Sequence, residues 1–258
     1  MPRPLHRGLI SIYASSASTV DDLLDLVGKG LEGEYTKEES SKISDRIDRL
    51  EEVGRGRDYL EDPRLVGYYR VQYVQDVGRG RPVGGNFRYT AAGRALFKTT
   101  DALQHILDKG VAVNMLYLKF LGSIPACVVL RGDFEQLSDA ERAQVEVKFQ
   151  TPPPGLSPQT IKASFDSPRI SFGPSGLFTF NVGPTTTVYL DTIYLDERIR
   201  IGKNRYGGRF VFTRLGEAEC LPGSPADAWR KFLAQSPGEV FLPPILHDAC
   251  LTGGASQD

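Results

Sequence analysis

The sequence contains few of the residues that form catalytic and metal sites. Its 258 residues include only three histidines and three cysteines. No histidine completes a Ser-His-Asp or Cys-His pattern, and no phosphate-binding loop is present. The cysteines, which are Cys127, Cys220 and Cys250, lie too far apart for a Cys-x-x-Cys motif and favour a reducing compartment. We therefore expect no catalytic residue, no metal site and no cofactor, and predict that the protein is not an enzyme.

The sequence also lacks an excess of one charge and a long apolar run. Lys and Arg number 31 against 32 Asp and Glu, so the formal net charge is -1. The Arg/Gly runs at 54–57 and 78–81 are short and are predicted to be solvated turns. The least polar stretch, Met115 to Leu130, is interrupted by Lys119 and Pro125 and is shorter than the roughly 20 apolar residues that cross a bilayer. We predict no nucleic acid partner and, at most, peripheral contact with a membrane.

The N-terminal segment has the composition of a transit peptide. Residues 1–19 contain basic residues and several Ser and Thr, and the first acidic residue of the chain is Asp21. A tail without a targeting function is the alternative. We assign residues 1–19 to a transit-peptide-like or disordered tail.

Two short helices are expected after this tail. Apolar residues recur with helical spacing from Val20 to Val27. Thr36 to Glu39 have the sequence of a capping box, in which the Thr hydroxyl and the Glu carboxylate each accept a hydrogen bond from a free backbone N–H. A second apolar stripe follows at Ile43, Ile47 and Leu50.

The period of the apolar residues then changes to that of β-strands. The expected strands are separated by turn residues and lie at 65–74, 111–120, 126–131, 143–149, 161–165, 170–172, 178–182, 189–202 and 209–214. Only 100–107 and 139–142 are predicted to be helical within this region. Many short strands separated by turns are typical of an antiparallel barrel or sandwich.

The strand pattern ends after Arg214. Residues 225–233, which include Trp229, are predicted to form a short helix that packs on the strands, and residues 252–258 are predicted to be disordered. We therefore expect one domain at 20–215, with a helical lead-in and a β-barrel, and a C-terminal extension at 216–258.

Two segments carry a resemblance to a known family. From Leu195 the sequence reads Leu-Asp-Glu-Arg-Ile-Arg-Ile, followed by a turn rich in Gly and Arg and by the strand Phe-Val-Phe that ends at Phe212. The segment from Leu65 to Tyr73 is similar to a first strand of the type Leu-x-Gly-x-Trp, with Tyr69 in the place of Trp. Both segments resemble the plastid lipid-associated protein family, also called fibrillins or plastoglobulins, and the resemblance extends over roughly 20–214.

The resemblance implies a fold, a function and a location. The implied fold is mainly β: an antiparallel lipocalin-like β-barrel preceded by two short α-helices, with a short C-terminal helix. The implied function is to bind or organise small apolar lipids of the carotenoid or prenylquinone type, without catalysis. The implied location is the chloroplast, where the protein would contact the stroma-facing thylakoid or the plastoglobule peripherally.

Alternate residues of a closed barrel face inward, where apolar side chains can hold one lipid. The candidates for this lumen are Tyr69, Val71, Tyr73, Asn114, Leu116, Phe178, Phe180, Tyr189, Phe210 and Phe212. The same residues could instead fill the core of a smaller barrel, and a slip of one residue in register would invert the set. Asn114 has two possible roles, a hydrogen bond to a ligand oxygen or the satisfaction of a turn or bulge.

The charges between Asp196 and Arg200 indicate a clasp at one end of the barrel. Arg200 is expected to lie over the ring of Tyr69 and to pair with a carboxylate, which resembles lipocalin-like barrels. Gly67 and Asp196 are the other expected members of this structural clasp.

The alternative function is that of an interaction protein, whose filled barrel docks an enzyme or a thylakoid membrane complex.

Overall fold

The computed structural model describes residues 6–75, 91–107, 110–151, 155–172 and 178–221. The strands are β1 (Gly67–Gln75), β2 (Phe97–Leu107), β3 (Val111–Phe120), β4 (Ile124–Gln136), β5 (Ile161–Phe165), β6 (Arg169–Phe172), β7 (Phe178–Asn181), β8 (Thr186–Leu195), β9 (Ile199–Asn204) and β10 (Arg209–Arg214). The α-helices are α1 (His6–Leu26), α2 (Lys37–Gly54), α3 (Ala91–Leu96) and α4 (Asp139–Phe149), and the 3-10 helices are η1 (Pro63–Leu65) and η4 (Glu217–Cys220).

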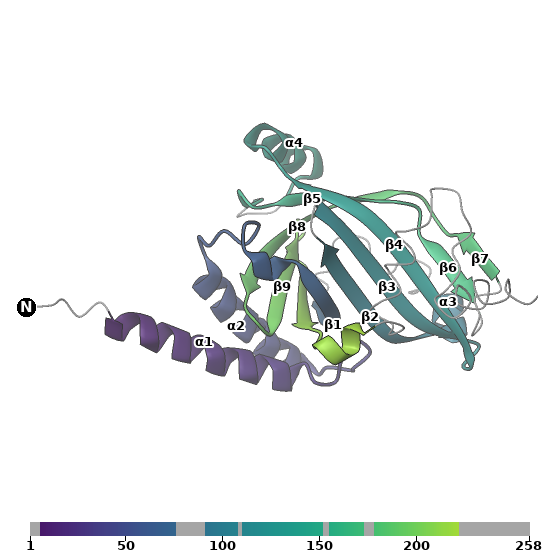
Figure 1. Ribbon diagram of the computed structural model, residues 1–258, viewed down its shortest axis with the longest axis horizontal. Coiled ribbons are helices and arrows are strands. Elements are labelled where there is room, and N and C mark those ends of the chain that lie inside the picture. Colours follow the sequence, from purple (N-terminus) through teal and green to yellow (C-terminus); the bar gives the residue numbers. More distant parts are fainter. Residues whose placement is uncertain (1–5, 76–90, 108–109, 152–154, 173–177, 222–258) are drawn as a thin grey trace, which may run out of the picture.

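Eight of the strands close into an antiparallel barrel (Figure 1). Their order around the barrel is β3-β2-β1-β10-β9-β8-β5-β4, and the pairing of β3 with β4 joins the two ends of this order. Strand β6 pairs with the part of β4 that β5 leaves free, and β7 pairs with β6. The predicted fold class, a mainly β protein with an antiparallel barrel, is therefore confirmed.

Strands β2 and β3 of the barrel are buried on both faces. In β3, Ala112 faces the interior, where it packs with Phe165 of β5. Its neighbours Val113 and Met115 lie in a second core on the outer face, together with Leu103 of β2. Because successive side chains of a strand point to opposite faces, this double burial explains why β3 is apolar along most of its length.

Helices α1 and α2 pack on the outer face of the barrel, at the lower left of Figure 1. The predicted capping box begins α2: Thr36 Oγ1 accepts from the N–H of Glu39 at 3.2 Å, and Glu39 Oε2 accepts from the N–H of Thr36 at 2.8 Å. Ile47 is completely buried and packs in one cluster with Ile201 and Val211 of the barrel. The predicted apolar stripe is thus the face that holds the helices on the sheet.

Helix α1 is longer than the helix that the sequence predicts. It begins at His6, so residues 6–19 of the predicted tail are continuous with the helical lead-in. The side chain of Ser16 is buried, and Asp22 pairs with Arg46 of α2 at 3.1 Å. A targeting role of residues 1–19 stays a prediction.

The helix predicted at 100–107 is wrong, because this segment belongs to β2. Its apolar residues come in the pairs 102–103 and 106–107, a spacing of four that imitates a helix. In the structure these pairs occupy both faces of a strand that is buried on both sides. A register shift between Thr99 and Asp101 adds an extra residue to the strand and bends it.

The strand predicted at 143–149 is also wrong, whereas the helix predicted at 139–142 is confirmed and continues to the end of α4. A capping box that starts at Ser138 favours the helix. Val145 is buried and packs with Phe149, four residues later, against Tyr189 of the barrel. Val147, which lies between them in the sequence, is 81% exposed. The alternation of apolar residues in the sequence therefore does not correspond to an alternation of burial.

The charged run from Asp196 to Arg198 forms the turn between β8 and β9. It divides the strand predicted at 189–202 into the two strands β8 and β9. The predicted turn rich in Gly and Arg and the strand predicted at 209–214 are confirmed as the β9–β10 hairpin, although β9 continues to Asn204, and Gly207 in the turn has a positive φ of 89°. That conformation favours glycine.

The chain leaves the barrel through Leu215, which is buried in the outer core with Leu103 and Val113. The helix predicted at 225–233 and the disordered end predicted at 252–258 lie outside the described residues. Among the described helices, none combines the length and apolar character that a membrane-spanning helix needs.

Candidate functional site

One end of the barrel interior is built around Tyr69 of β1, which is completely buried. Two guanidinium groups contact its ring, that of Arg200 at 5.0 Å and that of Arg214 at 5.3 Å from the ring centroid. Its hydroxyl donates a hydrogen bond to the carbonyl of Arg64 at 2.6 Å. Gly67 leaves the space that Arg214 occupies, since a Cβ at this position would collide with the guanidinium group. The two arginines and the backbone thus hold the ring in place.

Arg200 of β9 is a buried charge without a carboxylate beside it in the described part of the chain. Its side chain is 6% exposed, and its guanidinium lies 4.0 Å from the centroid of the Phe212 ring. Nη2 donates to Oε1 of Gln104 on β2, whereas Nε has no hydrogen-bond partner among the described residues. Burial lowers the pKa of Arg200 to about 10, so the group still carries its charge at neutral pH.

Gln104 and Asn114 extend this polar group along the inner wall. They lie directly opposite each other on β2 and β3, and Nε2 of Gln104 donates to Oδ1 of Asn114 at 2.8 Å. Because the oxygen of Gln104 accepts from Arg200, its amide nitrogen must be the donor to Asn114. The chain of hydrogen bonds therefore ends on the amide nitrogen of Asn114, which can donate to a further group.

The remaining interior is apolar and partly open. Ala112, Ala163 and Phe165 form a buried cluster on the inner wall. Further apolar side chains point inward by register yet remain partly exposed: Val71, Leu116, Val128, Leu130, Val188, Leu190 and Phe210. Water can reach an inward-facing side chain through the interior or through an open end of the barrel. The side chains of the wall therefore do not seal the inner face from water at these positions.

Six of the ten lumen candidates face this interior by register: Tyr69, Val71, Asn114, Leu116, Phe210 and Phe212. Phe178 and Phe180 lie on β7, which among the described strands pairs with β6 alone and is outside the closed ring of strands. Nothing is described of the side chains of these two residues. The part of any of the ten in binding a ligand stays a prediction.

Tyr73 lies on the outer face instead of in the lumen. It packs against the helices, with its ring 5.1 Å from that of Tyr35 in an edge-to-face arrangement. The reason is a register shift between Val71 and Tyr73, which makes Gln72 an extra residue in β1. Without this bulge, strict alternation would place Tyr73 on the same face as Val71.

Tyr189 also lies outside the barrel. It is opposite Lys162 on β5, at a position between the inward-facing Val188 and Leu190. Its ring lies 6.0 Å from that of Phe149 at the end of α4. Because the sequence predicts a strand in place of α4, it offers no outer partner for this tyrosine.

The predicted clasp is present in part. Arg200 lies over Tyr69 as expected. Asp196, however, caps the β8–β9 turn, where its Oδ1 accepts from the N–H groups of Arg198 at 2.7 Å and of Ile199 at 2.8 Å. The carboxylate expected beside Arg200 is thus used elsewhere.

Sequence reasoning missed Gln104 and Arg214. Gln104 lies in the segment that was expected to be helical, so its pairing with Asn114 could not be foreseen. Arg214 pairs in register with Tyr69 at the last position of β10. The bulge in β1 shifts the register between β1 and β10. The pairing of Arg214 with Tyr69 could therefore have been predicted only if the bulge had been known.

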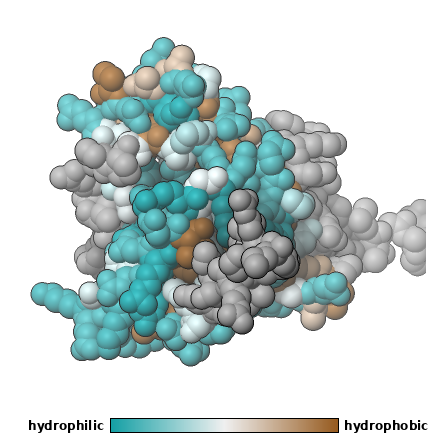
Figure 2. Space-filling view, turned by 90° about the vertical axis from the view of Figure 1, so that its left-hand side faces the viewer, coloured by the Kyte–Doolittle hydropathy of each residue, from teal (hydrophilic) through white to brown (hydrophobic). Residues whose placement is uncertain are grey.

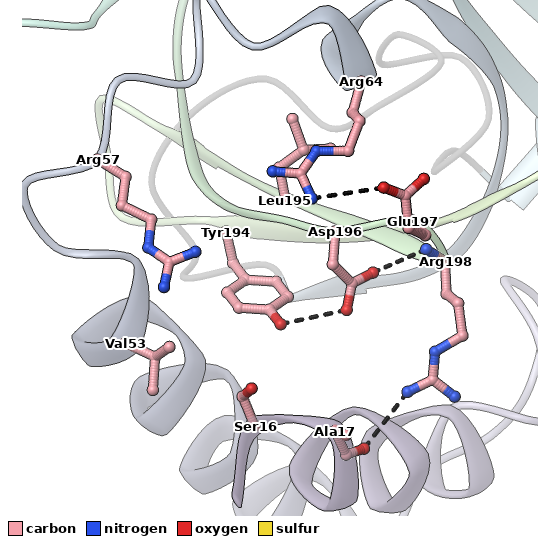
Figure 3. A pocket seen from close by; sticks show the side chains of 10 residues that line it. All are labelled: Ser16, Ala17, Val53, Arg57, Arg64, Tyr194, Leu195, Asp196, Glu197 and Arg198. Atoms are coloured by element: carbon pink, nitrogen blue, oxygen red, sulfur yellow. Dashed lines mark hydrogen bonds and ion pairs between the residues drawn. The ribbon is translucent and has the colours of Figure 1, made fainter. Parts of the chain in front are cut away.

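A separate hollow lies outside the barrel, between α1, α2 and the β8–β9 turn (Figure 3). Its volume is about 330 Å³, and three arginines line it, Arg57, Arg64 and Arg198. Arg198 forms an ion pair with Asp21, and Arg64 lies 3.6 Å from Glu197. Two of its cations thus have acidic partners, whereas Arg200 has none among the described residues. We therefore place the candidate site inside the barrel.

Comparison with known proteins agrees with the resemblance seen in the sequence. No family model and no solved structure match the chain. A protein of Arabidopsis thaliana described as "Probable plastid-lipid-associated protein 8, chloroplastic" is 28% identical to it over 155 residues. The resemblance to the plastid lipid-associated proteins is confirmed. The match covers 60% of this chain and 54% of that relative, so the chain spans about half of the relative's length.

Proposed function

We propose that this chain is a plastid protein whose barrel binds a small apolar lipid of the carotenoid or prenylquinone type, without catalysis. The observation that carries the proposal is the partial exposure of the apolar side chains that point into the barrel, among them Leu116 and Val128. An apolar cavity with a few polar groups is the usual form of a lipid-sized site. The name of the Arabidopsis relative, a chloroplastic plastid-lipid-associated protein, supports the plastid location and an association with lipid.

Lipid extraction tests this function. The purified full chain is incubated with plastid lipid extract, separated from free lipid by gel filtration, and analysed for co-eluting lipid. We expect a carotenoid or prenylquinone to co-elute. The variant Leu116→Trp fills the space in front of the inner wall and should retain several-fold less lipid.

The matched control is Val147→Trp, which adds the same ring to an exposed position of α4. It should retain as much lipid as the parent. If the parent retains no lipid, the lipid-binding proposal fails and the interaction-protein alternative is favoured. If Leu116→Trp retains as much as the parent, the lipid does not lie in the barrel.

An apolar tip at the β3–β4 turn supports a peripheral membrane contact. Leu121 is 58% and Ile124 is 40% exposed. The ring of Phe120 beside them lies 5.0 Å from that of Phe97 and 5.3 Å from that of Phe172. Large exposed apolar side chains that adjoin an aromatic cluster are typical of an interaction surface.

The charge next to this tip suits an anionic lipid surface. Lys98 and Lys119 lie opposite each other on β2 and β3, and both are exposed. By contrast, Figure 2 shows that the described surface on the left-hand side of Figure 1 is mostly hydrophilic, with hydrophobic residues in small separate areas. The proposed contact with the thylakoid or plastoglobule is therefore through the β3–β4 tip, with apolar insertion and lysines at the headgroups.

Flotation with vesicles that contain phosphatidylglycerol tests this contact. Leu121→Asp should reduce the floating fraction several-fold, because it removes an apolar contact and adds a charge that anionic lipid repels. Leu121 has a positive φ of 49°, a conformation that Asp tolerates. The control Val147→Asp changes an exposed valine on α4 and should float as the parent does. Equal loss in both variants would show that the tip has no special role.

A further inference from the structure

The described part of the protein does not neutralise the charge of Arg200. The guanidinium contacts the rings of Tyr69 and Phe212 and the neutral amide of Gln104. No ion pair joins it to a carboxylate of the described residues, although many other arginines of the chain have one. A buried charge is costly unless an opposite charge or several hydrogen bonds compensate it.

The inner wall of the described strands supplies no counter-charge. By register, its positions hold apolar side chains, glycine and the neutral polar residues Thr, Asn and Gln, apart from the arginines. The acidic residues of the same strands point outward, as do Asp101, Asp133 and Asp191. A group that neutralises Arg200 from within the barrel would therefore have to come from a ligand.

The polar groups without any partner among the described residues at this site are donors. Nε and Nη1 of Arg200 have no hydrogen-bond partner among the described residues, and the oxygen of Gln104 is already used. The oxygen of Asn114 accepts from Gln104, which leaves its amide nitrogen to donate. The site therefore selects an acceptor, and its positive charge favours an anionic one.

The inner wall carries no side chain next to Arg200 on its own strand. Gly202 faces the interior opposite Phe210, two residues after Arg200 on β9. A Cβ on Gly202 would lie 4.0 Å from Nη1 of Arg200 and 3.4 Å from Phe212. The partly exposed Leu116 follows Asn114 on the same face of β3. The charged group of Arg200 and the apolar side chain of Leu116 thus lie on the same inner surface, which is the arrangement that an amphipathic ligand requires.

We propose that the barrel interior binds an amphipathic lipid with a single carboxylate, which lies against Arg200 and Asn114 while its hydrocarbon chain lies along the apolar wall. This inference rests on the proposed function, because it requires the interior to be the lipid site, but it replaces the carotenoid or prenylquinone in that site by a lipid that carries a carboxylate. A lipid without a polar head would leave the buried charge unpaired. A monocarboxylate supplies one negative charge and two acceptor oxygens to the three donor groups.

Paired probes that differ only in the head group test this inference. Oleate and methyl oleate have the same chain, but only oleate carries a charge. Their affinities for the purified full chain are measured by displacement of a fluorescent fatty-acid analogue. We expect oleate to bind about tenfold to a hundredfold more tightly than methyl oleate, the difference that charge-assisted hydrogen bonds produce.

Two variants assign this preference to the site. Arg200→Met removes the charge and keeps much of the volume, so oleate should lose its advantage while methyl oleate binds as before. Asn114→Asp places a carboxylate at the end of the same hydrogen-bond chain and should also abolish the preference, with Arg200 and its packing on Tyr69 retained. The control Arg205→Met changes an arginine that stacks on Phe149 outside the barrel and should leave both affinities unchanged.

The outcomes separate the two proposals. If the parent binds oleate and methyl oleate equally, the carboxylate inference is overturned while the lipid site stands. If Asn114→Asp keeps the full preference for oleate, the head group does not lie at this site and the inference is again overturned. If the parent binds neither probe and no lipid from the plastid extract, the proposed function itself fails.

Discussion

Replacement of Gly54 by alanine tests how the helical lead-in is held on the barrel. Gly54 is the last residue of α2, and it is buried against β8. A Cβ at this position would lie 2.7 Å from Oη of Tyr59 and closer still to the carbonyl oxygen of Ile193. Ile193 is the extra residue of the register shift in β8, but its neighbours Thr192 and Tyr194 are both paired with β9, which limits how far its carbonyl can move. The end of α2 must shift instead, which disturbs the packing of the whole helix.

The expected cost follows from two opposing effects. Insertion of a methyl group into a packed site costs about 1–3 kcal/mol, and alanine returns up to about 1 kcal/mol through its higher helix propensity. Because the added Cβ overlaps two atoms severely, the upper part of the first range, about 2–3 kcal/mol, applies, and Gly54→Ala should lower the free energy of unfolding by roughly 1–2 kcal/mol. At about 2–4 °C per kcal/mol for a chain of this size, the melting temperature should fall by about 2–8 °C.

Thermal unfolding followed by circular dichroism measures this effect. The matched control is Gly216→Ala, where the nearest atom to the added Cβ is 3.9 Å away, at ordinary contact distance. The control should stay within about 0.5 kcal/mol of the parent. A melting temperature of Gly54→Ala that equals or exceeds that of the parent would refute the close contact between α2 and β8.

Two further predictions concern the helix caps. The hydrogen bonds of Glu39 to Lys29 and to the N–H of Thr36 lower the pKa of its carboxyl to about 2. A lowered pKa means that the charged form stabilises the fold above the usual value of 4.5 and that this contribution is lost as the pH falls through 2. Glu39→Gln should therefore melt below the parent at pH 7, and a difference that persists unchanged to the lowest pH would contradict the assigned ion pair. Ser138→Ala should destabilise the protein by about 1 kcal/mol in urea unfolding through loss of the α4 cap, and an unaltered midpoint would show that α4 adds nothing to global stability.

Elements that depend on local interactions could be predicted from the sequence. The capping box at Thr36 and the hairpin that ends at Arg214 are each specified by residues within a few positions of one another. The inward orientation of Phe210 and Phe212 follows from the same hairpin, because a regular two-stranded register fixes which face each residue occupies. Arg200 over Tyr69 required more, namely the analogy with other barrels.

The rest of the site depends on contacts between distant segments. Gln104 reaches Arg200 across 96 positions of sequence, and nothing in its own neighbourhood indicates an inward amide. Tyr189 is apolar enough for a lumen, but α4 covers it from the outside. Alternation alone assigns a residue to one of two faces, and it cannot say which face is the interior when both are buried. The helices that cover the outer face of the barrel bury apolar side chains there too. For this reason the sequence alone could not show which apolar residues face the interior.

Two irregularities in the strands connect that outer layer with the interior. Beside the bulge at Gln72, β8 has a second register shift between Thr192 and Tyr194. Each shift reverses the facing of the residues that follow, so Tyr73 and Tyr194 join the helix-facing core. With strict alternation both rings would project into the barrel, where they would occupy the space that the inward-facing side chains leave open. The bulges thus have two structural consequences. They give α1 and α2 an aromatic surface to pack on, and they keep two large side chains out of the proposed lipid site.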